Sequence, residues 1–205
     1  MINNMKTKVV IVNIERSLGL LSDPARFCSA ARLESAAKIS HPLRRMQGYA
    51  AELALSYALS GDKLLPPVYS YDGRGKPVIG DGFISLSHSG HIAVSAYSDC
   101  PVGIDAEAPR DVDPKLAVRM LCPAELRELG KSSDEHYLLR RFVMKEAYLK
   151  LTGAGVFGGL GRIFERDGSV FFDGVRAGFT HWIDPGGGIC CVVTQEESEI
   201  QVIEL

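Results

Sequence analysis

The sequence predicts an α+β protein built from two halves that meet near residue 100. Strand-rich and helix-rich stretches follow one another in blocks, without the regular alternation of a parallel α/β fold. The 205 residues are enough for one large domain or two small packed halves. The hydrophobic fraction of 46% and the charged fraction of 23% are typical of a soluble globular protein. We therefore expect an N-terminal half over residues 1–100 and a C-terminal half over residues 101–205.

The first half is expected to begin with a strand and two helices. Residues 8–14 are rich in Val and Ile, which favours a buried strand. Asp23 and Pro24 supply an N-cap and a proline at the first helical position, which predicts a helix to about residue 38. Pro42 opens a longer helix that Gly61 ends. Turn-rich residues 66–82 follow, and then strands over 83–86 and 91–97.

The second half is expected to open on a strand over residues 102–107, followed by helices. Short helices begin after Asp113 and at Pro123. Ser132 and Glu135 have the spacing of a capping box, which predicts the start of a helix that ends near residue 152. The remaining predicted strands span residues 169–172, 179–183, 189–194 and 199–203.

Charge and cysteine content exclude several classes of protein. The formal net charge of −2 argues against a general nucleic-acid binder. The five cysteines are odd in number and form no CxxC pair, so reduced thiols in a cytoplasmic protein are expected rather than a zinc ribbon or a disulfide framework. The sequence contains no apolar run near the roughly 18 residues of a membrane span, so no membrane partner is expected.

Two acidic residues lie two positions apart on the predicted strand 102–107. Side chains alternate between the faces of a strand, so Asp105 and Glu107 point the same way, roughly 6 to 7 Å apart at the backbone. Carboxylate oxygens at this separation can converge on one hard cation, and oxygen ligands suit Mg2+ better than Zn2+. A half-exposed strand with two solvated acids shows the same spacing, so both interpretations stay open on this motif alone.

The last predicted helix carries charges within an apolar surround. Between Leu138 and Leu151 apolar residues occur on all sides, which indicates a largely buried helix. Lys145, Glu146 and Lys150 then need specific partners, because an unpaired buried charge is costly. Glu146 and Lys150 are four residues apart, so a surface ion pair is one interpretation. The other is a site in which the carboxylate binds a metal or accepts a proton and the lysines hold phosphate.

Together these two stretches resemble the signature of the 4′-phosphopantetheinyl transferases. VGIDAE at 102–107 is similar to the (V/I)G(I/V)DxE strand motif of that family. FVMKEAYLK at 142–150 is similar to its (F/W)(S/C/T)xKE(A/S)xxK helix motif, with Val143 in place of the usual small polar residue. The length of 205 residues resembles that of the longer, pseudo-dimeric members, such as the type that activates surfactin synthetase.

Three upstream matches extend the resemblance to about residues 40–155. Gly75-Lys76-Pro77 resembles the family's GKP turn, and Ile84 to Ser89 resembles its SHS strand end. Arg44, four residues before Gly48, resembles the arginine that opens a helix in the first half. The order and spacing of five short motifs is more specific than any one of them.

The resemblance implies a role for each residue of the acidic and basic motifs. Asp105 and Glu107 would bind Mg2+, with Glu146 as a third ligand or as the general base. Lys150 would contact the pyrophosphate of coenzyme A and act with Asp105 and Glu146 as part of the catalytic set. Lys145 belongs to the same motif and is assigned with the coenzyme A-binding residues.

The resemblance also implies a nucleotide site in the first half. His88 and Arg44 would hold the 3′-phosphate of coenzyme A, with help from Ser87, and Lys76 would lie near the nucleotide. Arg32 and Lys38 are further candidates for a phosphate contact.

The implied activity is transfer of 4′-phosphopantetheine from coenzyme A to a serine of an apo acyl or peptidyl carrier protein, with release of 3′,5′-ADP. The implied fold has two similar α+β halves related by a pseudo-twofold axis, with the active site in the cleft between them, and a monomer is expected. The carrier would dock on apolar surface of the second half, for which Leu116, Val118, Met120, Leu121 and Leu126 are candidates. Ordinary helix-core positions are the other interpretation of these residues. A magnesium-dependent phosphohydrolase and a catalytically silent coenzyme A- or carrier-binding module stay open as alternatives.

Overall fold

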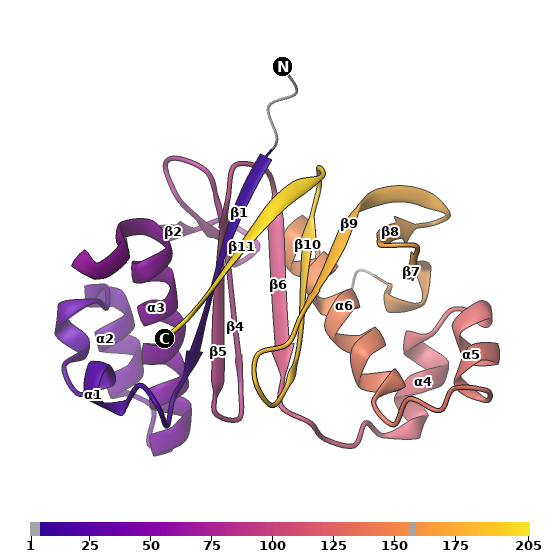
Figure 1. Ribbon diagram of the computed structural model, residues 1–205, viewed down its shortest axis with the longest axis horizontal. Coiled ribbons are helices and arrows are strands. Elements are labelled where there is room, and N and C mark those ends of the chain that lie inside the picture. Colours follow the sequence, from indigo (N-terminus) through magenta and orange to yellow (C-terminus); the bar gives the residue numbers. More distant parts are fainter. Residues whose placement is uncertain (1–4, 156–158) are drawn as a thin grey trace.

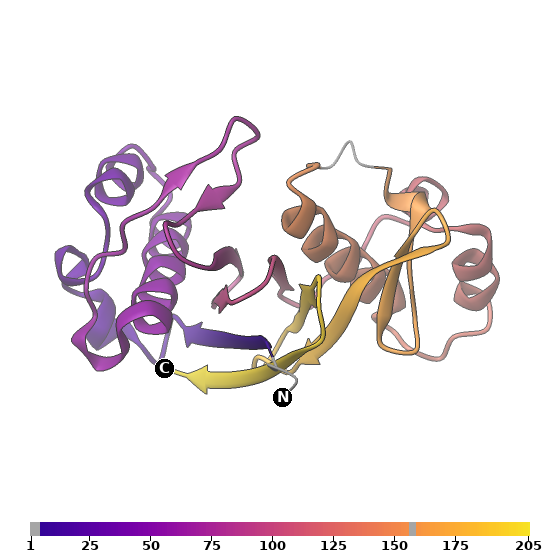
Figure 2. The same ribbon diagram turned by 90° about the horizontal axis from the view of Figure 1, so that it is seen from above.

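Two β-sheets pack against each other, and each sheet carries one long helix on its outer side (Figure 1). The computed structural model describes residues 5–155 and 159–205. The layer order is therefore helix, sheet, sheet, helix, and the view from above in Figure 2 places the two long helices on opposite sides of the strands. The predicted α+β class is confirmed. A pseudo-twofold relation is compatible with the helix-on-sheet arrangement of both halves and stays a prediction.

The first sheet has the order β11-β1-β5-β4. Strand β1 (Met5–Asn13) pairs antiparallel with β5 (Ile92–Ser98) and parallel with β11 (Ser198–Glu204), and β4 (Phe83–Ser89) forms the other edge. Helix α3 (Pro42–Ser60) lies on this sheet. The smaller elements of this half are α1 (Leu18–Leu21), η1 (Pro24–Arg26), α2 (Ala30–Ala37), η2 (Gly61–Lys63), β2 (Ser70–Tyr71) and β3 (Pro77–Val78).

The second sheet has the order β6-β10-β9-β8-β7, with every neighbouring pair antiparallel. Helix α6 (Tyr137–Thr152) packs on β6 (Val102–Glu107) and β10 (Ile189–Thr194). Two seven-residue helices, α4 (Pro114–Met120) and α5 (Pro123–Leu129), precede α6. The remaining elements are η4 (Leu160–Arg162), β7 (Ile163–Arg166), β8 (Ser169–Phe172) and β9 (Val175–Ile183).

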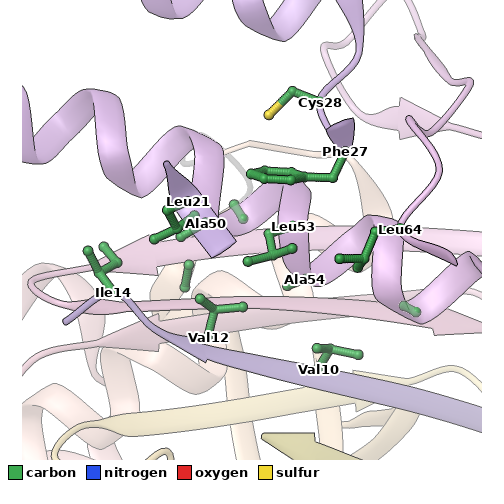
Figure 3. Close-up of a cluster of buried hydrophobic side chains, with 13 residues drawn as sticks. Val10, Val12, Ile14, Leu21, Phe27, Cys28, Ala50, Leu53, Ala54 and Leu64 are labelled. Atoms are coloured by element: carbon green, nitrogen blue, oxygen red, sulfur yellow. The ribbon is translucent and has the colours of Figure 1, made fainter. Parts of the chain in front are cut away.

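Three buried clusters hold the layers together. In the first, α3 and the outer side of β1 enclose side chains such as Val10, Val12 and Leu53 (Figure 3). Alternation along β10 separates the other two clusters. Cys190 and Val192 join the cluster between the sheets, whereas Cys191 and Val193 join the cluster under α6. β10 is buried on both faces, which explains why its sequence is continuously apolar.

The last strand departs from the expected division of the chain at residue 100. β11 pairs with β1 in the first sheet, with Val9 opposite Val202 and Lys8 opposite Gln201. Ser198 of β11 also contacts β1 through its side chain, because its Oγ lies 2.8 Å from Thr7 Oγ1. The seven residues of β11 therefore belong to the sheet of the first half, although they lie at the end of the second half of the sequence. The assignment of separate functions to the two halves stays a prediction.

Two predicted helix starts are wrong. Helix α6 begins at Tyr137, and its N-cap His136 makes no capping bond through its side chain. Ser132 Oγ instead accepts a hydrogen bond from the Asp134 N–H, because serine also stabilises local turns. A capping box does occur in this half, at the start of α5, where Glu125 accepts from the Cys122 N–H at 2.9 Å.

In the first half, Asp23 and Pro24 open only the short η1 turn. Helix α2 begins after Ser29, whose side chain accepts from the Arg32 N–H. All five cysteines are free, and four of them are buried. Within the described ranges, no helix combines the length and apolar character needed to cross a membrane.

Candidate active site

A glycine lets α6 pack directly on β6. A Cβ atom added at Gly103 would lie only 1.9 Å from the carbonyl oxygen of Ala147 and 2.5 Å from the Leu151 nitrogen. No side chain other than that of glycine leaves room for this contact. Residues 103, 105 and 107 share this face of β6, whereas Val102, Ile104 and Ala106 face the other sheet. Asp105 and Glu107 are thus directed toward the side of α6 that carries Glu146 and Lys150.

Alternating serines on β4 hold the two acidic residues of β6. Ser87 Oγ donates to Asp105 Oδ1 at 2.7 Å, and Ser89 Oγ donates to Glu107 Oε2 at 2.6 Å. Ser85 Oγ, the next serine on the same face, accepts from the Ile104 N–H at 3.0 Å. The serine side chains therefore join the two sheets where their edges β4 and β6 meet. They also fix the orientation of both carboxylates.

Lys150 pairs with Asp105. Its Nζ lies 2.7 Å from Asp105 Oδ1 and 3.2 Å from the carbonyl oxygen of Leu86. Of the two interpretations of this helix, the surface ion pair between Glu146 and Lys150 does not form, because Lys150 reaches across to β6 and β4 instead. One ammonium group therefore stands beside the acids and at the wall of a pocket.

Two carboxylate oxygens of this group have no partner. Asp105 Oδ2 and Glu146 Oε1 are buried and accept no hydrogen bond from any described residue. Burial raises the pKa of Glu146, the nearby Asp105 and Glu107 carboxylates raise it further, and Lys150 opposes them. The negative charges of Asp105 and Glu107 thus act on Glu146, while one oxygen each of Asp105 and Glu146 has no hydrogen-bond partner among the described residues.

These oxygens fit a hard divalent cation, which is the ligand that neutralises clustered carboxylates. The described residues contain no group of three acidic, His or Cys side chains already arranged as a metal shell. Asp105, Glu107 and Glu146 therefore do not form a ready-made ligand set, and the Mg2+ assignment stays a prediction.

A pocket of about 500 Å³ opens next to the acids and draws its walls from both halves of the chain. This volume suits a small organic ligand. Four segments of the chain contribute cationic or titratable nitrogen groups to its lining: α2, the β2–β3 segment, β4 and α6. The corresponding lining residues are Arg32, Arg74, Lys76, His88 and Lys150. The pocket is therefore suited to a polyanion.

His88 and Lys76 both lie in this pocket, as their predicted roles require. Surrounding protein lowers the pKa of His88, and the cationic side chains of Lys150 and Arg32 lower it further. His88 is therefore neutral at neutral pH in the free protein. Lys76 Nζ donates to the carbonyl oxygen of Leu151 at the end of α6, and burial lowers its pKa. Ser87 lines the same pocket while it holds Asp105.

The structure does not place Arg44 in the pocket. Arg44 is exposed on the first turn of α3 and is absent from the described pocket lining. Arg32 takes the corresponding position: its side chain lies over α3 at Gly48, with Nη1 3.6 Å from the position of a Cβ there. Lys38, the other candidate, pairs with Glu34 on the surface of α2. Arg44 was assigned from its position in a motif, and that position does not determine in which direction the side chain points.

Arg32 is held by a buried carboxylate that the sequence analysis missed. Glu52 is fully buried on α3, and its carboxylate lies 3.7 Å from Arg32 Nε. The same carboxylate accepts from the Ser29 N–H at 2.8 Å and from the Tyr69 hydroxyl at 2.6 Å. A charged residue in the apolar stretch of the α3 sequence was the available signal.

The assignment of Lys145 to coenzyme A binding is wrong. Its side chain is fully buried and absent from the described pocket lining, and it forms an ion pair with Glu125 at 2.6 Å. Its Nζ donates to Glu125 and to the carbonyl oxygens of Met120 and Leu160, so no donor is left for a ligand in the pocket. Burial lowers the pKa of Lys145, and Glu125 opposes that effect.

The site is thus a mixed acidic and basic pocket at the junction of two helix-covered sheets, and comparison with known proteins gives its class. A family profile described as the 4′-phosphopantetheinyl transferase superfamily matches residues 101–182. Residues 101–182 are therefore similar to that superfamily, and the resemblance inferred from the motifs is confirmed.

Individual relatives agree with this assignment. The chain is 37% identical over 110 residues to the 4′-phosphopantetheinyl transferase psf-1 of Bacillus pumilus, covering 51% of this chain and 46% of that protein. It is 33% identical over 151 residues to the 4′-phosphopantetheinyl transferase HetI of Nostoc sp., covering 66% of this chain and 64% of that protein. Sfp of Bacillus subtilis is 32% identical over 94 residues, covering 43% and 42%. In each case the chain spans less than two thirds of the relative's length.

Proposed function

We propose that the protein transfers the 4′-phosphopantetheine group of coenzyme A to a serine of a carrier protein, releasing 3′,5′-ADP. One arrangement carries the proposal: Glu146 and Lys150 line a cationic pocket, Lys150 pairs with Asp105, and Asp105 and Glu146 each keep one carboxylate oxygen without a hydrogen-bond partner among the described residues. Such a pocket suits a pyrophosphate that must be held and neutralised during phosphoryl transfer. The names of the relatives support the same activity.

Asp105, Glu107 and Glu146 are the residues that would hold Mg2+. A bound Mg2+ would neutralise negative charge on phosphate oxygens. The serine donors on β4 keep Asp105 and Glu107 oriented toward α6 before any ligand arrives. Glu146, whose free oxygen is buried, would either complete the ligand set or take the proton of the attacking serine.

Lys150 would move its charge to the phosphate. In the free protein its ammonium group balances Asp105. Lys150 also lines the pocket, where its ammonium group would contact the pyrophosphate and stabilise the charge that develops on the leaving group. The flexible lysine side chain allows this contact without movement of α6.

The end of the pocket with Arg32 and His88 would bind the 3′-phosphate. Each can donate charged hydrogen bonds to phosphate oxygens once His88 is protonated. Lys76, anchored at the end of α6, would lie beside the nucleotide. Arg32 replaces Arg44 in this role because Arg32 lines the pocket.

The carrier protein would dock on α4 and α5. Leu116, Val118 and Leu126 are exposed there by 42%, 75% and 37%. The other two candidates, Met120 and Leu121, are buried core residues and cannot contact a carrier. Exposed apolar side chains on adjacent helices suit a transient protein interface. A carrier at this surface would approach the acids from the second half of the chain. The monomeric state and the cytoplasmic location inferred from the cysteines remain part of this proposal.

The direct experiment is mass spectrometry of apo acyl and peptidyl carrier proteins after incubation with the protein, coenzyme A and Mg2+. We expect one carrier to gain a single phosphopantetheine group on serine. A parallel reaction without carrier tests the hydrolase alternative. A hydrolase would cleave coenzyme A at the same rate with and without carrier. Coenzyme A binding with no modification of any carrier would support the silent binding module instead.

Arg32 and Arg44 form a matched pair for the nucleotide site. We expect Arg32→Gln to raise the KM for coenzyme A about tenfold, because it removes a charged hydrogen bond to phosphate. Arg44→Gln should change that KM less than about twofold, because its side chain is outside the pocket. Steady-state kinetics with coenzyme A as the varied substrate measure both. A larger effect for Arg44→Gln would return the phosphate contact to that residue.

His88 should make recognition of the 3′-phosphate depend on pH. Its pKa is lowered in the free protein, and a bound phosphate would raise it, so binding takes up a proton. Affinity for the 3′-phosphate therefore increases as the pH falls. The ratio of KM for coenzyme A to KM for 3′-dephospho-coenzyme A should therefore decrease as the pH is lowered from about 8 to about 6.5. The ratio should be flat in His88→Gln, and an equal slope in both proteins would remove His88 from this role.

A further inference from the structure

Lys145 connects α6 to three other segments. Its Nζ donates to the carbonyl oxygen of Met120 at 2.8 Å, to Glu125 Oε2 at 2.6 Å and to the carbonyl oxygen of Leu160 at 3.1 Å. An ammonium group has three N–H donors, so all of them are used. The acceptors lie at the end of α4, within α5 and at the start of η4. One buried side chain thus ties these elements to α6.

Lys145 is the fully buried polar side chain among the contacts that hold α4 and α5 on α6. α4 and α5 have seven residues each, which is too short for either helix to be stable alone. Their apolar contact with α6 is a small cluster in which Ala117, Met120, Leu121 and Tyr137 are buried. Tyr137 and Arg141 of α6 also contact Glu125 and Glu128 of α5. Glu125 Oε2 also caps the start of α5 through the Cys122 N–H. Glu125 therefore stabilises the start of α5 and also attaches α5 to α6 through Lys145.

The two faces of α6 serve different parts of the molecule. Glu146 and Lys150 line the pocket, whereas Lys145 points into the α4–α5 segment. The exposed Leu116, Val118 and Leu126 belong to that segment. A shift of α4 and α5 on α6 would move this surface relative to the pocket without changing the pocket itself.

We infer that Lys145 is a positioning residue that sets the place of the α4–α5 surface relative to the catalytic face of α6. This inference rests on the proposed function in one respect, that the carrier docks on this surface. It predicts that loss of Lys145 impairs use of the carrier far more than use of coenzyme A.

The test is Lys145→Met, which keeps the length of the side chain and removes its donors. With the apo carrier protein that the wild type modifies, we expect the KM for the carrier to rise about tenfold and the KM for coenzyme A to change less than about twofold. Val143→Ala is the matched control, because Val143 is fully buried on α6 away from the pocket and from α4 and α5. It should lower the melting temperature and leave the ratio of the two KM values unchanged.

Hydrogen exchange provides a readout that needs no transfer activity. In Lys145→Met, amides of residues 113–130 should exchange faster, while those of β6 and of the first sheet should keep their protection. Should Lys145→Met fail to fold, Glu125→Gln keeps the capping acceptor and removes the ion pair, and it should show the same local pattern more weakly. Exchange that increases uniformly, or equal rises in both KM values, would overturn the inference. If the wild type transfers nothing, the exchange pattern still decides the positioning role while the proposed activity fails separately.

Discussion

Asp105→Asn should abolish magnesium-dependent transfer while the protein stays folded. The substitution keeps the shape of the side chain and an acceptor for Ser87, but it removes the negative charge that Asp105 contributes beside Glu146. We expect kcat to fall by at least about 10³-fold, because both the cation and the reacting phosphate depend on this charge. Transfer to carrier, followed by mass spectrometry over time, measures the loss.

The stability of Asp105→Asn should change little. The variant loses the ion pair with Lys150 and also relieves the repulsion with Glu146, and these two effects oppose each other. Asp99→Asn is the matched control, since Asp99 is exposed outside the pocket and only accepts from the Lys6 N–H. Near-normal turnover by Asp105→Asn would show that this carboxylate is not part of the reaction.

Gly103→Ala should be strongly destabilising. The added Cβ would overlap the backbone of α6 at Ala147 and Leu151, where no flexible side chain can move aside. Overpacking against backbone forces the helix away from the sheet, and we expect a loss of about 3 kcal/mol in the free energy of unfolding. Urea denaturation followed by circular dichroism measures it.

Activity in Gly103→Ala should fall beyond the effect of stability. α6 carries Glu146 and Lys150, and β6 carries Asp105, so a shift of about 1 Å between them can cost about 100-fold in kcat. Gly19→Ala is the control, because an added Cβ there meets no atom within 4 Å. A fully active and stable Gly103→Ala protein would mean that the close contact of α6 with β6 is not needed.

Local patterns were sufficient to predict the acidic strand and its orientation. Alternation placed Asp105 and Glu107 on one face, and the structure has them on the face toward α6 because Gly103 on the same face admits the helix. The alternating serines of β4 could have been read in the same way, since Ser87 and Ser89 follow one face of a strand. Which strand they would face depends on how the two sheets pack, which no local pattern contains.

The direction of single charged side chains was harder to predict. Lys145 lies in a family motif, yet its helical position turns it away from the pocket and toward Glu125, a partner 20 residues earlier. Arg44 matches a motif position, whereas Arg32 reaches the pocket through contacts with Glu52 and α3. β11 joined the first sheet for a similar reason, because strand pairing between the two ends of the chain leaves no signal in either segment.

The most direct test of the acidic arrangement is a titration of the protein with Mn2+, a spectroscopic substitute for Mg2+, in the presence of coenzyme A and without carrier. Electron paramagnetic resonance should report one bound ion per chain in the wild type and a loss of that ion in both Asp105→Asn and Glu146→Gln. Unchanged Mn2+ binding in both variants would contradict a shared cation site between β6 and α6.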